Sequence, residues 1–164
     1  MTELDGPHRT RRRRGIRMTD SGRTEATPLV ARGCLAAIAV FMLPVGFQAT
    51  LTPRSFFDDF PLGRGWIAAD GASYNEHLVR DVGVLFLALI VVTGWTAWRA
   101  TGAAAAVSVA WLVQGSGHLW YHGAHLEGIE GLDRVALIGS LAAVPILAGV
   151  ALWASVGDRG MRTR

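Results

Sequence analysis

The chain has 164 residues, which allows one domain at most, and 51% of them are hydrophobic, as expected for a largely membrane-embedded protein. The formal net charge is +3, but no recognition element accompanies the basic residues, so nucleic acid is not an expected partner. The single cysteine, Cys34, excludes an internal disulfide, a thiolate metal cluster and a redox pair.

Residues 1–28 are polar and rich in arginine, and they lack any apolar periodicity. We predict that this segment is a disordered tail. An arginine run just before a first apolar segment is a positive-inside signal, which places the tail in the cytoplasm. The apolar segment that follows is longer than the core of a signal peptide and precedes no clear small-x-small cleavage site. We therefore expect it to be kept as an anchor.

Four apolar stretches follow, at about 33–51, 79–98, 101–122 and 135–156. Each has the length that a helix needs to cross a hydrocarbon core of roughly 30 Å. The sequence predicts an all-α membrane protein, in which residues 29–157 form four transmembrane helices in an up-down-up-down bundle. Four crossings return residues 158–164 to the cytoplasm as a second tail, so both termini are inside. A long outer loop then connects the first two helices.

The first polar stretch, residues 75–81, leads into the second predicted helix. In a helix, His77 and Asp81 share one face, and Glu76 and Arg80 share a neighbouring face. The Glu76–Arg80 spacing is typical of an ordinary helix ion pair. A carboxylate one turn from an imidazole fixes its tautomer, or joins it in binding one cation.

The second polar stretch lies at the end of the third predicted helix. His118, His122 and His125 fall at i, i+4 and i+7, which is one stripe of a helix. Two histidines one turn apart are a pattern that binds zinc, copper or iron. The alternative is that these imidazoles bond only to backbone, water or lipid phosphate.

Both polar stretches are predicted at the same depth on the outer side of the membrane, because the second helix begins there and the third ends there. We predict an extracytoplasmic pocket with a transition-metal ion bound by His77, Asp81, His118 and His122. Further polar residues are expected around these ligands, namely Asp58, Asp59, Glu76, Arg80, His125 and Glu127.

These patterns resemble small four-helix integral membrane proteins of unknown function that are common in actinobacteria. The resemblance covers about residues 30–156 and rests on the histidine-rich third helix and on two motifs, Phe57-Asp58-Asp59-Phe60-Pro61 and Tyr74-Asn75-Glu76-His77-Leu78-Val79-Arg80-Asp81-Val82-Gly83. It implies a four-helix bundle in the bacterial plasma membrane, and it implies no reaction or cofactor.

Several functions remain open at this point. A metal site serves an enzyme by activating water, or serves a binding protein by holding the ion. A non-enzymatic accessory subunit would instead bind a membrane-protein partner through the same outer residues. A third interpretation is a b-type haem electron carrier with His77 and His118 as axial ligands.

Overall fold

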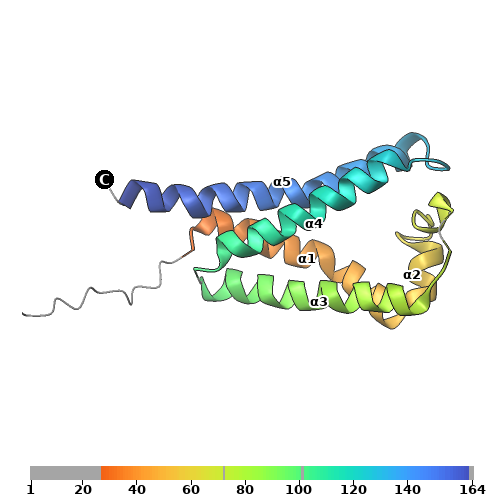
Figure 1. Ribbon diagram of the computed structural model, residues 1–164, viewed down its shortest axis with the longest axis horizontal. Coiled ribbons are helices and arrows are strands. Elements are labelled where there is room, and N and C mark those ends of the chain that lie inside the picture. Colours follow the sequence, from red (N-terminus) through yellow and green to blue (C-terminus); the bar gives the residue numbers. More distant parts are fainter. Residues whose placement is uncertain (1–26, 72, 101, 163–164) are drawn as a thin grey trace, which may run out of the picture.

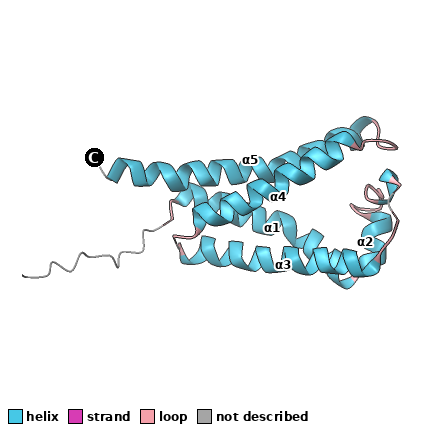
Figure 2. Cartoon of the chain, viewed as in Figure 1, coloured by secondary structure: helices cyan, strands magenta, loops and turns pink. Residues whose placement is uncertain are grey.

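The computed structural model describes residues 27–71, 73–100 and 102–162. The predicted disordered tail therefore lies outside the described residues, apart from its last two positions. Over the described part, the chain forms five α-helices and one 3-10 helix, with no strand (Figure 2). In chain order these are α1 (Leu29–Leu51), α2 (Pro53–Asp59), η1 (Ala68–Asp70), α3 (Glu76–Arg99), α4 (Ala104–Ala124) and α5 (Gly131–Arg162).

Three of the long helices are long and apolar enough to cross a membrane, at Leu29–Leu51, Glu76–Arg99 and Gly131–Gly157. The three apolar helices indicate a membrane protein. The fourth long helix, α4, has 21 residues and no charged side chain. It does not reach the same apolarity, because Gln114, Ser116 and two histidines interrupt its second half. Four crossings were predicted, and the structure provides three candidates of the predicted kind.

Helices α1, α3 and α5 begin three or four residues earlier than predicted, and α4 begins three residues later. The Asn75 side-chain oxygen accepts a hydrogen bond from the Leu78 backbone N–H at 3.2 Å, so α3 begins at Glu76 instead of at residue 79. At its other end, Ala100 adopts a left-handed conformation that ends the helix after Arg99. Helix α5 extends from residue 131 to Arg162 and so continues into the segment predicted as a tail.

The long helices form two closely packed pairs, α1 with α3 and α4 with α5 (Figure 1). A further interface joins α1 to α5, whereas α3 and α4 share few contacts although a short turn connects them. We call the end with this turn the turn end, and the end where α1 leads into α2 and α4 into α5 the loop end. Figure 1 shows the two pairs diverging toward the loop end.

Glycines set this pairing by allowing close approach of the helices. A Cβ atom at Gly83 of α3 would lie 2.7 Å from the Thr50 backbone nitrogen of α1. A Cβ atom at Gly115 of α4 would lie 2.9 Å from the Pro145 ring of α5. Side chains at these two positions would push each pair apart, so the glycines allow α1 to pack closely on α3 and α5 on α4.

The main hydrophobic core lies toward the turn end. Leu35 and Ile38 of α1, Trp111 of α4 and Ala148 of α5 are fully buried there. The Trp111 indole N–H donates to the Thr93 hydroxyl of α3 at 2.8 Å, and that hydroxyl donates to the Leu89 carbonyl at 2.6 Å. Large apolar side chains instead cover the outside of the helices, as a lipid environment requires.

Candidate functional site

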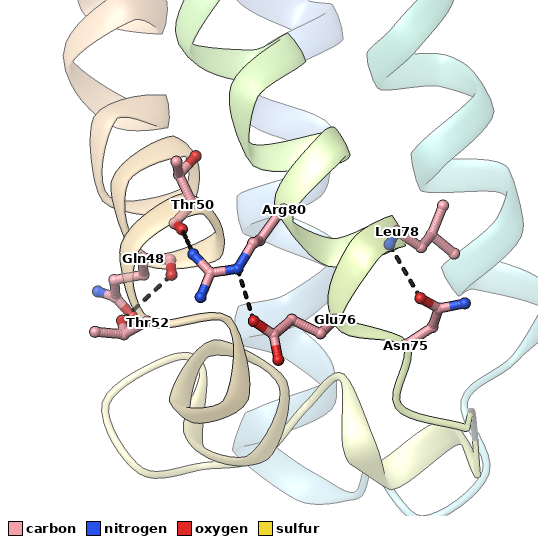
Figure 3. Close-up of polar contacts among 7 residues, drawn as sticks. All are labelled: Gln48, Thr50, Thr52, Asn75, Glu76, Leu78 and Arg80. Atoms are coloured by element: carbon pink, nitrogen blue, oxygen red, sulfur yellow. Dashed lines mark hydrogen bonds and ion pairs between the residues drawn. The ribbon is translucent and has the colours of Figure 1, made fainter.

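The first turns of α3 are tied to the end of α1 by an arginine (Figure 3). Arg80 Nε donates to Glu76 Oε1 at 2.8 Å, which is the predicted ion pair, and Arg80 also donates to the Thr50 carbonyl of α1. Thr50 belongs to the last turn of α1, where carbonyls lack intrahelical partners and carry partial negative charge. Glu76 and Arg80 therefore have a structural role in joining α1 to α3.

His77 and Asp81 form the predicted pair on the neighbouring face of α3. His77 Nε2 lies 3.3 Å from Asp81 Oδ2, and this contact is an ion pair only when the imidazole is protonated. The His77 side chain is 87% exposed and that of Asp81 is 57% exposed. The pair thus lies on the outer surface of α3.

The histidines of α4 contact one another and their own helix. The His118 and His122 rings meet edge to face with centroids 4.6 Å apart. His125 caps the helix: its ring stacks on Tyr121 at 4.4 Å, and its Nδ1 lies 2.8 Å from the Tyr121 carbonyl oxygen. His118 and His122 are accordingly the close pair, while His125 is held back against Tyr121.

The predicted four-ligand metal site is not assembled. Within the described ranges, no group of three or more His, Cys, Asp or Glu side chains is placed to hold a metal ion. The physical reason is the helix pairing, because α4 packs along α5 and α3 packs along α1. The polar stretches of α3 and α4 therefore do not meet, although both lie at the loop end. The structure forms two pairs, His77 with Asp81 and His118 with His122.

Two of the outer residues predicted around the ligands, Asp58 and Asp59, accept hydrogen bonds within their own helix. Within α2, Arg54 Nε donates to Asp58 at 2.5 Å, and the Ser55 hydroxyl donates to Asp59 at 2.9 Å. The Asp58 carboxylate raises the pKa of the Arg54 guanidinium, by accepting this bond and by its charge. Glu127 lies exposed in the connection between α4 and α5.

A contact that the sequence did not predict joins the two loops of the loop end. Arg64, in the loop after α2, donates to the carboxylate of Asp133 in the first turn of α5. Nearby, the backbone of Gly128 approaches Ala69, since a Cβ at Gly128 would lie 3.1 Å from the Ala69 carbonyl oxygen. These contacts connect the α1–α3 pair to the α4–α5 pair where the helices themselves diverge.

A second arginine contact mirrors that of Arg80 at the turn end. Arg32, in the first turn of α1, donates from Nε to the Ala97 carbonyl of α3 at 2.7 Å and from a terminal nitrogen to the Trp98 carbonyl at 3.5 Å. Each helix of the α1–α3 pair thus carries an arginine near its start that binds carbonyls near the end of the other. The signal in the sequence is one arginine in an early turn of each of these two apolar helices.

A scan against protein-family models, a search of curated proteins and a search of solved structures each find no match to this chain.

Proposed function

We propose that the chain is a four-span integral protein of the bacterial plasma membrane, with both termini in the cytoplasm and the loop end outside. Helix α4 would be the additional span, because 21 residues at about 1.5 Å each cover about 31 Å and none of them is charged. Twelve of the sixteen arginines lie before or within α1, at the turn end, or at the end of α5. This asymmetry supports the orientation through the positive-inside rule. The resemblance to actinobacterial four-helix membrane proteins is consistent with the same arrangement.

We further propose that the loop end binds a transition-metal ion, with zinc, copper or iron as the candidates, through His118 and His122. The observation that carries this proposal is the 4.6 Å separation of the two rings on one stripe of α4. Imidazole nitrogens bind zinc at about 2.0–2.1 Å, so both rings can reach one ion by small side-chain rotations. Water or a bound molecule would supply the remaining ligands, as in sites that keep an open position.

The position of this pair along α4 adds support. Trp111 and Gly115 belong to the buried face of α4, and His118 and His122 follow them at helical spacing, with His122 half-buried and His118 exposed. Ionisable groups within a membrane-spanning helix are costly unless they have a role, so the two histidines mark candidate functional positions. The His77 side chain is 87% exposed on the outer surface of α3, which does not favour a haem between His77 and His118.

The second candidate function is a non-enzymatic accessory subunit. This function is favoured because the other basic residues of the loop end have structural roles. Arg54, Arg64 and Arg80 all bind neighbouring groups of this chain. These interactions shape an outer surface for a membrane-protein partner and supply no reactive group.

Metal content separates the two candidates. The wild type, H118A and H122A variants are purified in mild detergent, supplied with zinc, copper or iron, desalted and analysed for bound metal. H77A and D81A are the matched controls, because they remove the other pair at the same end. We expect about one equivalent in wild type and in the controls, and a loss of metal in H118A and H122A. Equal metal content in all five proteins, or none in any, contradicts the metal proposal, and co-purification of a partner without metal then supports the accessory role.

The orientation has its own test. In a C34A background, a cysteine replacing Leu62, which is 97% exposed in the first loop, should react in intact cells with a membrane-impermeant maleimide. A cysteine replacing Ala103 at the turn end should react only after lysis. The reverse labelling pattern contradicts the proposed orientation.

A further inference from the structure

The last turns of α3 carry an arginine packed against two tryptophans at the turn end. The Arg99 guanidinium carbon lies 4.7 Å from the centroid of the Trp95 ring and 4.7 Å from that of Trp98. The two indoles are nearly perpendicular, with centroids 5.9 Å apart. Trp95 is 53% exposed and Trp98 is 68% exposed, so this group, which we call the Arg99 cluster, lies on the surface. Cation–π contacts with two rings fix the guanidinium in place.

The positive charge of this cluster has no acidic partner in the part of the chain that the structure describes. The two helices that meet at the turn contribute no acidic side chain near it, because residues 82–126 contain neither Asp nor Glu. The partial negative charge at the end of α3 is already met by Arg32, which binds the carbonyls of Ala97 and Trp98. Among the described residues, then, no carboxylate neutralises the charge of Arg99, which leaves its guanidinium able to bind an anion.

The place of the cluster determines which anion it meets. Arg99 is the last residue of a candidate membrane span, and its two neighbours are exposed tryptophans, which favour the level of the lipid headgroups. A guanidinium packed against indole rings keeps N–H edges that bind phosphate oxygens in the plane of the group.

We propose that the Arg99 cluster, formed by Trp95, Trp98 and Arg99, is a binding site for the phosphate of an anionic phospholipid headgroup. The guanidinium binds the phosphate oxygens, and the exposed indole surfaces contact the upper part of the acyl chains. This site lies at the opposite end of α3 from His77 and Asp81, and it is independent of any metal at the loop end.

The test measures lipid retention. Wild type and variants are purified from nanodiscs that contain phosphatidylglycerol and phosphatidylcholine in equal amounts, and the retained lipids are counted by native mass spectrometry. R99Q removes the charge, and W98L removes one stacked ring but keeps the charge. W153L is the matched control, because Trp153 is 76% exposed near the same end of α5 and contacts no arginine among the described residues.

We expect R99Q to retain phosphatidylglycerol about fivefold less than wild type, the effect of one interfacial charge, and W98L to show a smaller loss. W153L should retain as much as wild type. Wild-type retention in R99Q, or an equal loss in W153L, overturns the proposal. Displacement of the retained lipid by millimolar inorganic phosphate also overturns it, since the site then takes free phosphate. If R99Q does not fold, W98L compared with W153L decides the question.

Discussion

The close approach of α1 and α3 at Gly83 leads to a sharp prediction for Gly83→Ala. The added Cβ would lie 2.6 Å from Thr50 Oγ1, 2.7 Å from the Thr50 nitrogen and 2.9 Å from the Ala49 carbonyl carbon. Two of these three atoms are backbone, so no side-chain rotation relieves the contact, and α1 must move away from α3. Overpacking of this kind costs about 1–3 kcal/mol. Movement at Thr50 also weakens the bond that its carbonyl accepts from Arg80.

Gly94→Ala is the control, because Gly94 lies in the same helix with no atom within 4 Å of an added Cβ. Alanine favours a helix over glycine by about 1 kcal/mol at both positions, so this contribution cancels when the two variants are compared. We expect G83A to be less stable than G94A by about 1–3 kcal/mol in reversible unfolding by SDS in mixed micelles. Equal stability of the two variants would refute the tight α1–α3 contact.

Three further predictions concern individual bonds. Trp111→Phe removes the 2.8 Å hydrogen bond to the Thr93 hydroxyl, and the loss of this bond should lower the free energy of unfolding by about 0.6–1.7 kcal/mol. A double-mutant cycle with Thr93→Val measures this coupling, and strictly additive effects would show that the bond contributes nothing. Arg80→Met should lower the free energy of unfolding by about 1 kcal/mol, which is small for loss of a charged donor because the Arg80 side chain is 45% exposed. An unchanged free energy of unfolding would contradict the role of this arginine. R64D and D133R should each increase the rate of proteolysis in the first loop, because loss of the ion pair lowers the free energy of local opening by less than about 1 kcal/mol. The R64D/D133R double variant should restore protection. A double variant as sensitive as the single ones rules out the pairing.

The sequence predicted the long helices well because their apolar length is a local property. Three of the four predicted spans are recovered as apolar helices of the required length, and the fourth is a helix of lower apolarity. The boundaries were less accurate because they depend on single capping groups. Asn75 starts α3 earlier than its apolar residues suggest. The arrangement of the helices was not predictable, since a glycine such as Gly115 signals close packing without naming its partner.

The candidate site shows the same division between local and distant contacts. Pairs one helical turn apart form as predicted, as His77 with Asp81 and Glu76 with Arg80 show. Their assembly with His118 into one cluster does not follow, because it requires the correct rotation of two helices as well as equal depth. Spacing within one helix determines the directions of its side chains relative to one another, whereas contact between two helices depends on packing elsewhere in the bundle.

The pairing of α1 with α3 and of α4 with α5 has a consequence for biosynthesis. Consecutive long helices form each pair, so the molecule consists of two hairpins that leave the ribosome one after the other. The bond between Arg80 and the Thr50 carbonyl joins residues 30 positions apart in the chain, whereas the bond between Arg32 and the Ala97 carbonyl joins residues 65 positions apart. We therefore expect the first hairpin to close from the loop end toward the turn end, before α4 is complete. It then presents Leu35 and Ile38 as a finished surface on which the second hairpin assembles.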